Sequence, residues 1–573
     1  MRMSMFLSVL VMTACGGTTD ESDATDASVV EDAPVNVWED VEPVARYFEK
    51  AADISWKRLD GTDFVLSEHY TGDDSFVVLL FVPGSGYHDA VWNDARPQKL
   101  LNSSPDNTHY IFGSWESEAS ARKDRLEALH GDFEQALARM GEEAQAHWAD
   151  RLHFVTPRPD SDNFGWAGEL GAANIRRTDA YHAGVRNVGF GIDQRQRIRP
   201  IGEFVDWAAN GSYPMEYLAN HAVYFDFEEQ RQRALDAEEA MTVRLWDNEN
   251  SGTGWGGNAI YVDVEMPDHT SYDTLHLDLL QSCTHIESIT DKNGDGRDDN
   301  NGASVGDLNC PEWDRITSLH LCENRPADAG KDFVEVCDLE VGRWITGYTS
   351  EGRWVHDISP LLAALPSGQT ARFKYKAIDN HPITLDFRFT TTGQARPTQL
   401  IPLYSGGQLT ACTNDRYEPM DVTIPAEATR VELAAVITGH SFGKESKNCA
   451  EFCNHEHHFV VGGETYTEDH PEANDYYGCR DAVDIGVYPN QYGSWIFGRA
   501  GWCPGQEVPM WRQDVTDQIT AGGTTTVDYS VTVDGQNFDP YWTENPGWDC
   551  ASGEGAGFWV PEFSMASWLV VYE

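Results

Sequence analysis

The sequence predicts a multidomain protein in which an α/β domain precedes two all-β antiparallel sandwich domains. A chain of 573 residues is longer than one hydrophobic core supports, so about three or four domains are expected. Up to about residue 201, apolar runs of strand length alternate with a helical pattern, which is typical of α/β domains. From Met241 onward, short alternating runs recur between Gly, Asn and Pro clusters, which is typical of antiparallel sandwiches.

The α/β domain is expected at residues 37–222. Its first strands are predicted at 64–66 and 76–82, and two more at 152–155 and 188–193. Residues 118–148 place apolar side chains at three- and four-residue spacing, so we expect a helix with one face against a core. These side chains are Leu126, Leu129, Phe133, Leu137 and Met140.

The motifs Gly-Thr-Asp-Phe at 61–64 and Gly-Ile-Asp-Gln at 191–194, around a buried strand, resemble a thioredoxin-like domain. In that family a reactive cysteine follows the first central strand, but this chain has Gly-Ser-Gly-Tyr-His-Asp at 84–89. We therefore expect a redox-inactive domain that serves docking or support. His88 and Asp89 are candidates for acid–base chemistry, although two polar residues after a glycine turn usually form a loop.

The two β domains are expected at 241–395 and 396–573, with the boundary near Arg396 and Pro397. A charged, Ala-rich stretch at 223–240 predicts the helix that connects them to the α/β domain. Strand-like alternation is clearest at 242–246, 259–264, 275–280 and 385–389, and again from 422 to the end of the chain.

The chain is strongly acidic, with 41 Lys and Arg residues against 93 Asp and Glu residues. The net charge of -52 repels polyanions and keeps the surface soluble, so nucleic acid is not an expected partner. We expect the protein to act as a monomer.

The N-terminus predicts an exported lipoprotein. Arg2, an apolar run at 6–12 and Met-Thr-Ala before Cys15 resemble a lipoprotein signal over residues 1–15, with Cys15 lipidated and the chain anchored to a bacterial membrane or cell surface, in the periplasm or outside the cell. The alternative is an ordinary cleaved signal peptide. Residues 16–36 hold few large apolar side chains, so we expect a disordered acidic tether.

Besides Cys15, the other ten of the 11 cysteines lie between Cys283 and Cys550. An even number in an exported chain favours disulfides. The spacing lacks the paired Cys-x-x-Cys units of zinc sites, so metal binding by these thiols is not expected.

Three segments resemble the peptide-N-glycosidase F family. They are Cys-Pro-Glu-Trp-Asp-Arg at 310–315, Asn-Cys-Ala-Glu-Phe-Cys at 448–453 and Arg-Ala-Gly-Trp-Cys-Pro-Gly at 499–505. The resemblance covers about residues 241 to 573 and implies two eight-stranded jelly-roll domains. It also implies an amidase that hydrolyses the glycosylamide bond of N-linked glycans in peptides or proteins, giving aspartate and a glycosylamine.

Such hydrolysis needs a carboxylate that takes a proton from water and donors that stabilise the oxyanion. The resemblance implies that Asp314 is the principal catalytic residue and that Glu451 supports it. Each residue also has an alternative without a role in catalysis. Asp314 could form a solvated ion pair with Arg315, Glu451 could serve only to complete a tight disulfide loop, and Trp502 could belong to the hydrophobic core. The substrate-binding residues are expected to be Trp313, Arg315, His440, Arg499 and Trp502. Of these, the resemblance implies that the indoles of Trp502 and Trp313 stack on a sugar face.

One departure from the family concerns a further glutamate on the strand that runs through 373–380. Ile378 stands there, and a one-residue slip offers Asp379, a shorter carboxylate that we retain as a third catalytic candidate. The departure affects rate and substrate preference more than the class of reaction.

The family resemblance implies the pairs Cys283–Cys310, Cys449–Cys453 and Cys479–Cys503, and we further propose Cys322–Cys337 and Cys412–Cys550. The first pair encloses an acidic insertion whose side chains are phased like a calcium loop: Asp291, Asn293, Asp295 and Asp299. Gly302 occupies the twelfth position, so an ordinary EF-hand is excluded. We expect a structural calcium ion, the alternative being a merely acidic loop, and no cofactor for catalysis.

Two other functions compete with amide hydrolysis. The double jelly roll also occurs in copper-dependent monooxygenases, and Asn-His-Glu-His-His at 454–458 resembles one copper site, but a second cluster and a methionine ligand are not apparent. The other is an inactive glycan-binding lipoprotein. Pure binding would not need Asp314, Arg315, Glu451 and Arg499 together, so the amidase is favoured.

Overall fold

The computed structural model describes residues 36–573 apart from 94, 160–161, 172–188, 203–213, 253–256, 288–289, 291, 293–307, 328–330, 410–411, 442–449, 534 and 536–560. Residues Asn36–Glu573 form one compact unit. Within this described part, no helix is both long enough and apolar enough to cross a membrane. Cys15 and all four predicted calcium ligands, Asp291, Asn293, Asp295 and Asp299, lie outside the described residues.

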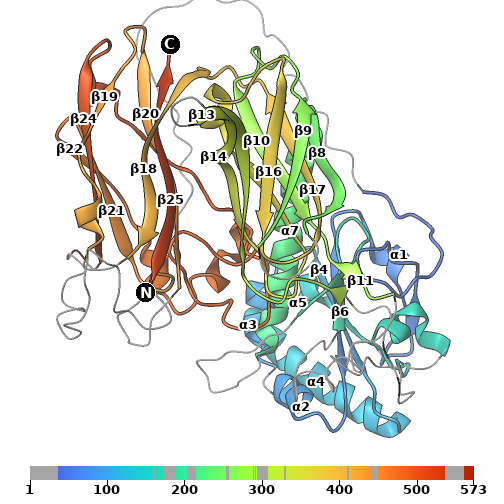
Figure 1. Ribbon diagram of the computed structural model, residues 1–573. Coiled ribbons are helices and arrows are strands. Elements are labelled where there is room, and N and C mark those ends of the chain that lie inside the picture. The colour runs from blue at the N-terminus through green and yellow to red at the C-terminus, as the bar shows by residue number, and fades with distance from the viewer. Residues whose placement is uncertain are drawn as a thin grey trace, which may run out of the picture. The chain divides into compact units, whose positions relative to one another are not determined.

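The α/β domain is built on a five-stranded sheet of order β5-β4-β3-β6-β7 (Figure 1). The strands β3 (Ser75–Phe81), β4 (Thr108–Ser114) and β5 (Leu152–Phe154) run parallel. Strand β6 (Gly189–Ile192) pairs antiparallel with β3, and β7 (Ile198–Pro200) pairs antiparallel with β6. All seven residues of β3 are buried, as expected for a strand covered on both faces of its sheet. The predicted strands are confirmed, while the thioredoxin-like fold itself stays a prediction.

Short elements surround this sheet. A hairpin of β1 (Ser55–Lys57) and β2 (Asp63–Val65) leads into α1 (Leu66–His69). The long helix predicted at 118–148 is two helices, α4 (Ala119–Met140) and α5 (Glu142–Ala149), because Gly141 between them has φ of 106°. Leu126, Leu129 and Phe133 are buried as predicted.

The expectation of a loop at 84–89 is wrong. Helix α2 (Gly86–Asn93) begins within this segment and is followed by α3 (Pro97–Ser103), so His88 and Asp89 lie in a first helical turn. The His88 ring is buried, and its Nδ1 accepts a hydrogen bond from the Val82 N–H at 3.3 Å. His88 therefore holds the end of β3 rather than facing a substrate.

Helix α7 (Leu218–Ala237) begins before the connecting helix that we predicted at 223–240. Its first half is buried partly in the α/β core and partly in a cluster that includes Tyr488 of the second β domain. Phe225 packs so closely on β6 that a Cβ at Gly191 would lie 2.7 Å from its ring. The helix is therefore part of the α/β core as well as the link to the first β domain.

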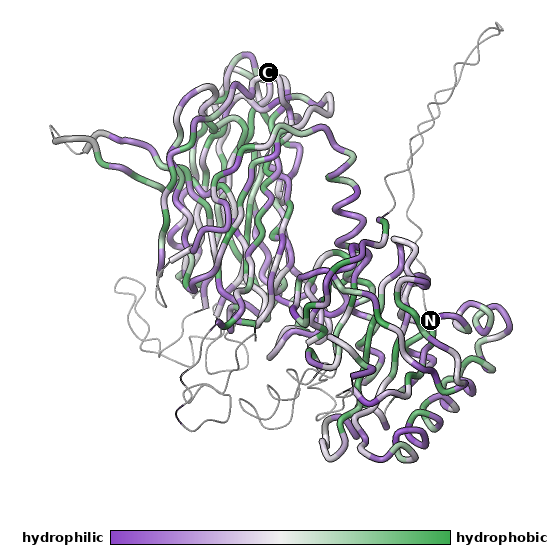
Figure 2. Tube along the Cα trace, turned by 90° about the vertical axis from the view of Figure 1, so that its right-hand side faces the viewer, coloured by the Kyte–Doolittle hydropathy of each residue, from purple (hydrophilic) through white to green (hydrophobic). Residues whose placement is uncertain are grey.

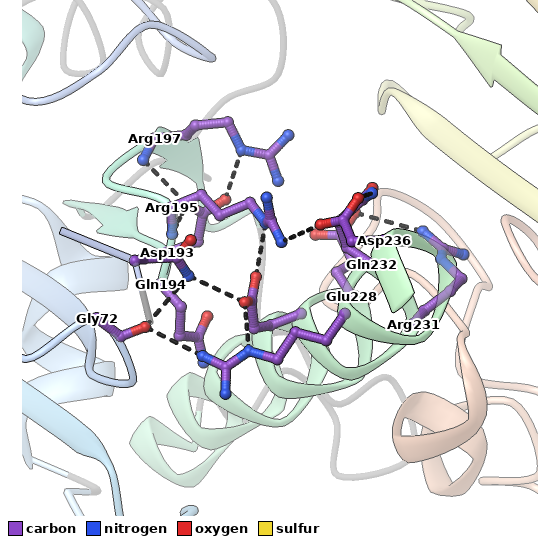
Figure 3. Close-up of polar contacts among 12 residues, drawn as sticks. Gly72, Asp193, Gln194, Arg195, Arg197, Glu228, Arg231, Gln232 and Asp236 are labelled. Carbon is purple, nitrogen blue, oxygen red and sulfur yellow. Dashed lines mark hydrogen bonds and ion pairs between the residues drawn. The ribbon is translucent and has the colours of Figure 1, made fainter. Parts of the chain in front are cut away.

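Ion pairs hold the second half of α7 to the β6–β7 hairpin (Figure 3). Arg199 contacts Asp193 at 2.9 Å and Glu228 at 2.7 Å, and Arg195 contacts Glu229 at 2.7 Å. On the other side, the Arg231 guanidinium donates to the backbone oxygen of Arg353 in the first β domain at 2.9 Å. Polar contacts thus continue from the hairpin through the helix into the β domain.

In the described parts of both β domains, two four-stranded sheets form an eight-stranded jelly roll, as the family resemblance predicted. In the first, the sheets are β15-β10-β17-β8 and β14-β13-β16-β9. In chain order its strands are β8 (Met241–Asn250), β9 (Asn258–Glu265), β10 (Thr274–Gln281), β13 (Ile316–Ala327), β14 (Lys331–Ile345), β15 (Gly352–Asp357), β16 (Thr370–Ala377) and β17 (Pro382–Thr390).

The second jelly roll repeats this strand order, with sheets β18-β25-β20-β23 and β19-β24-β21-β22. Figure 2 shows hydrophobic and hydrophilic residues interleaved along the strands, as expected where one face of each sheet lies in a core. The strands are β18 (Pro397–Gln408), β19 (Met420–Thr423), β20 (Arg430–His440), β21 (His455–Val461), β22 (Glu464–Glu468), β23 (Trp511–Asp514), β24 (Thr524–Val533) and β25 (Glu562–Tyr572).

The two jelly rolls share buried surface. Trp568 and Val570 of β25 belong to the same hydrophobic cluster as Trp344 of the first domain. Arg343, which is 3% exposed, pairs with Glu340 at 2.6 Å and donates to Thr438 of the second domain at 2.9 Å. Strand β18 begins at Pro397, next to the boundary predicted near residue 396, and the shared core fixes the loops of both domains at their junction.

Three predicted disulfides are present: Cys283–Cys310, Cys322–Cys337 and Cys479–Cys503. Cys412 and Cys453 are also disulfide-bonded. Their predicted partners, Cys550 and Cys449, lie outside the described residues, so these two pairings stay predictions.

The packing of α7 can be tested by changing Phe225 to Ala. Because this ring is 1% exposed and fills the space left by Gly191, we expect the free energy of unfolding to fall by about 3–5 kcal/mol, measured by urea denaturation. Gln230→Ala, at an exposed position of the same helix, is the control and should change it by less than about 0.5 kcal/mol. Equal effects of the two changes would contradict the packing described.

Candidate active site

The three segments that carry the family resemblance meet at the junction of the two jelly rolls. Asp314 lies just before β13, Glu451 lies between β20 and β21, and Arg499 lies in the long connection between β22 and β23. The first comes from one domain and the other two from the next, so the fold brings together side chains that are far apart in sequence.

Arg499 is the centre of the site. Its side chain is 0% exposed, and it contacts both acids: Nε lies 3.1 Å from Oε1 of Glu451, and Nη2 lies 3.5 Å from Oδ2 of Asp314. The guanidinium also donates to the backbone oxygen of Phe497 at 2.9 Å. A buried cation is tolerated only with such partners, so the three side chains depend on one another.

Burial controls the charge of both acids. It raises the pKa of Asp314 above its ordinary value, and the positive charge of Arg499 and a hydrogen bond from Tyr348 only partly offset it. Burial likewise raises the pKa of Glu451, opposed by Arg499 and assisted by the negative charge of Asp314. Proton affinity is therefore increased at two neighbouring carboxylates, as is common in catalytic sites.

Tyr348 is a site residue that the sequence did not reveal. Its hydroxyl donates to Oδ2 of Asp314 at 2.7 Å and accepts from Nη2 of Arg499 at 3.3 Å. Burial raises its pKa, so it stays protonated and remains a donor. The buried Gln491 side chain accepts from the Tyr348 N–H at 2.7 Å and fixes the loop. It lies outside the three segments that carry the family resemblance, and no motif marks it.

Trp313 and Arg315 flank Asp314 on a fixed backbone. The Thr346 hydroxyl donates to the Trp313 oxygen at 2.6 Å and accepts from the Arg315 N–H at 2.8 Å. The Trp313 side chain is nevertheless exposed, with a fraction of 47%. An exposed indole on a rigid loop suits stacking on a sugar face, as predicted.

Asp379 lies near the same site. The pKa of Asp379 is raised by burial, and the charge of Arg315 opposes this shift; the same arginine lowers the pKa of Asp314. The backbone oxygen of Asp379 accepts a hydrogen bond from the Ser251 hydroxyl at 3.0 Å. The structure thus places Asp379 within the electrostatic reach of Arg315, and its catalytic role stays a prediction.

The expected stacking of Trp502 on a sugar is wrong. Its side chain is 4% exposed, its Nε1–H donates to the Gly439 oxygen at 2.7 Å, and the Arg499 guanidinium carbon lies 4.9 Å from its ring centroid. His440 stacks on the same ring, with centroids 5.4 Å apart, and is buried too. Burial lowers the pKa of His440 to about 3. Both residues form a neutral layer against Arg499 instead of the predicted substrate contacts.

Comparison with known proteins gives a family match over residues 409–560, to the family described as "Peptide-N-glycosidase F, C terminal". A curated relative, peptide-N(4)-(N-acetyl-beta-D-glucosaminyl)asparagine amidase F of Elizabethkingia miricola, is 30% identical over 263 residues, which cover 41% of this chain and 67% of the relative. The chain belongs to the peptide-N-glycosidase F family.

Solved structures of related proteins resemble this chain more weakly than the sequence relative does. PNGase F, a glycosylasparaginase from Flavobacterium meningosepticum, has a TM-score of 0.39 and 17% identity, covering 59% of this chain and 96% of that one. PNGF-II has a TM-score of 0.39 and 12% identity, covering 60% of this chain and 67% of that one. The family assignment rests on the sequence relative.

Replacing Arg499 by Met tests the mutual dependence of the three charges. Both acids already have raised pKa values in the folded state, so the cost of ionising them is absent at low pH and grows as pH rises through the folded values. Without the guanidinium these values rise further. We expect the free energy of unfolding to fall by about 3–5 kcal/mol at neutral pH, and by much less below about pH 3, where carboxyls are mostly protonated even in an unfolded chain.

The measurement is denaturant unfolding across this pH range. Arg325→Met is the control, because that guanidinium is 47% exposed and its pair with Asp338 at 2.6 Å is a surface pair of small value. If Arg499→Met lowers the free energy of unfolding by the same amount at every pH, the proposed coupling between the charges of Arg499, Asp314 and Glu451 is contradicted.

Proposed function

We propose that this chain is a peptide-N4-(N-acetyl-beta-glucosaminyl)asparagine amidase, acting on N-glycosylated peptides or proteins. The observation that carries the proposal is the Asp314 carboxylate, held between the Tyr348 hydroxyl and the Arg499 guanidinium beside Glu451. The named activity of the Elizabethkingia relative agrees with it.

In the proposed reaction, water adds to the side-chain carbonyl carbon of the glycosylated asparagine, and Asp314 accepts a proton from that water. The carbon–nitrogen bond then breaks, the nitrogen takes a proton and leaves as a glycosylamine, and aspartate remains. Burial supports the role of Asp314, because a raised pKa makes the carboxylate a stronger base. Tyr348 and Arg499 both contact Oδ2, so the orientation of the carboxylate is fixed before substrate binds.

Glu451 acts from the other side of Arg499. By accepting from Nε at 3.1 Å it orients the guanidinium toward Asp314, and its raised pKa suits a group that exchanges a hydrogen bond with the substrate amide. The exposed Trp313 indole is the proposed stacking surface for the sugar. No step of this reaction requires a cofactor.

Asp314→Asn tests the proposed base. The amide keeps the shape of the side chain but cannot take a proton, so we expect the rate of deglycosylation to fall by about 10²–10⁴-fold. The assay follows the gel shift of a denatured N-glycoprotein and the increase of about one dalton that converts asparagine to aspartate. Asp338→Asn, at a 52% exposed position, is the control. A folded Asp314→Asn variant with full activity would refute the role, and glycan binding without hydrolysis by the unchanged protein would favour the inactive glycan-binding alternative.

Tyr348→Phe tests the hydrogen bond to the base. This bond lowers the pKa of Asp314, so its loss should raise that pKa by about one to two units, since a hydrogen bond to a charged group is worth about 1.5–3 kcal/mol. The acidic limb of the pH–rate profile reports ionisation of the base and should move to higher pH. The matched variant Tyr476→Phe, at an exposed tyrosine, should leave the limb in place. A shift to lower pH, or none, would remove Tyr348 from the mechanism.

We further propose that the protein is exported and lipid-anchored through Cys15, with a structural calcium ion in the insertion at 291–299 and a redox-inactive thioredoxin-like domain. The three described disulfides support export, because such bonds persist in oxidising compartments. The lack of any cysteine from residue 16 to 282 supports a domain without thiol chemistry.

A further inference from the structure

A group of three histidines lies in the second jelly roll, separate from the residues of the proposed reaction. His455 and His457 occupy alternate positions of β21, and His470 follows β22. Their exposed fractions are 0%, 0% and 4%. One ring nitrogen from each lies within 4.8 Å of the other two, so a single ion could be reached by all three side chains.

The outward nitrogen of each ring has its own partner. His455 Nε2 lies 3.0 Å from the backbone oxygen of Ala450, His457 Nδ1 lies 2.6 Å from the Tyr529 hydroxyl, and His470 Nδ1 lies 3.6 Å from a Glu472 carboxylate oxygen. Histidines that bind metals are held in this way, with one nitrogen on the ion and the other on a carbonyl, hydroxyl or carboxylate.

The inward nitrogens are His455 Nδ1, His457 Nε2 and His470 Nε2. The first two are 2.6 Å apart, whereas His470 Nε2 is buried and has no hydrogen-bond partner among the described residues. Zinc–nitrogen bonds of about 2.0–2.1 Å in a tetrahedron set the nitrogens about 3.3 Å apart. To bind an ion, His455 Nδ1 and His457 Nε2 therefore need to move apart only slightly. The ion would also give His470 Nε2 a partner.

A cavity leads to the histidine group. His470 lines this cavity of about 360 Å³ together with Glu468 and Trp502, which gives an ion a route in. Glu468 is the β-ladder partner of His457. Its carboxyl group is the candidate for the fourth ligand.

The donor set points to one class of ion. Three imidazoles with a carboxylate or water suit Zn²⁺ and its neighbours in the first transition row, and not Ca²⁺ or Mg²⁺, which prefer oxygen. A second group of histidines, His69, His109 and His153, is also close together. There, however, the Arg58 guanidinium lies 2.8 Å from His69 Nε2 and its charge opposes a cation.

We propose that His455, His457 and His470 bind one divalent transition-metal ion, with Zn²⁺ as the expected occupant. The site adjoins the proposed catalytic loop, because the Ala450 oxygen that contacts His455 belongs to the residue before Glu451. The Glu451 backbone oxygen in turn accepts from the Ala500 N–H, next to Arg499, at 2.9 Å. The ion takes no part in amide hydrolysis; it fixes the loop that carries Glu451.

The test uses the full chain, stripped with a chelator and dialysed into buffer that contains excess Ca²⁺, so that the insertion at 291–299 does not compete. Zn²⁺ is titrated calorimetrically, and Co²⁺ is added separately to read the visible absorption of a tetrahedral nitrogen site. We expect one ion per chain and a higher melting temperature with Zn²⁺. Failure of the stripped, folded protein to bind either ion would overturn the proposal.

His470→Gln is the informative variant, because glutamine keeps much of the volume but loses the imidazole ligand. We expect zinc binding at least about 100-fold weaker and loss of the cobalt spectrum. His458→Gln is the control. His458 lies on the other face of β21, where it contacts Thr467 at 2.8 Å, so the variant should bind zinc as tightly as the unchanged protein. Unchanged binding by His470→Gln would place the ion elsewhere and overturn the assignment, whatever the amidase activity of the chain.

Discussion

The buried guanidinium of Arg499 is the interaction on which the proposed active site depends. It has no exposed surface and is held by carboxylates from both jelly rolls, so neither acid can be lost without leaving buried charge uncompensated. The same contact explains how two acids with raised pKa values remain available as carboxylates. Trp502 and His440 pack against this group and contribute shape without charge.

The surrounding fold supplies the rigidity that such a contact needs. A hydrophobic cluster runs through both jelly rolls, and Arg343 binds across the domain boundary to Thr438. Gln491 fixes the loop of Tyr348 at 2.7 Å. These contacts hold residues from separate domains in one geometry, which is what a preorganised site requires. If the histidine group binds a metal ion, it adds a further constraint on the loop of Glu451.

Much of this arrangement could be predicted from the sequence, because the motifs around Asp314, Glu451 and Arg499 indicated both the jelly rolls and the convergence of these side chains. Other features depend on packing that no motif encodes. Trp502 was expected at a sugar, but whether an indole is exposed is decided by its neighbours. Tyr348 joins the site through the fold of its loop. The start of α7 was missed because six of the eight residues from Leu218 to Phe225 are buried, which weakens the amphipathic period that predicts a surface helix.

The central claim is that water attacks the amide carbon between glycan and asparagine at Asp314. Incubating the full chain with an N-glycopeptide in water that carries heavy oxygen tests it most directly. The account predicts one heavy oxygen atom in the new aspartate carboxyl group of the peptide. A peptide that gains no heavy oxygen and keeps an N-acetylglucosamine on asparagine would contradict it.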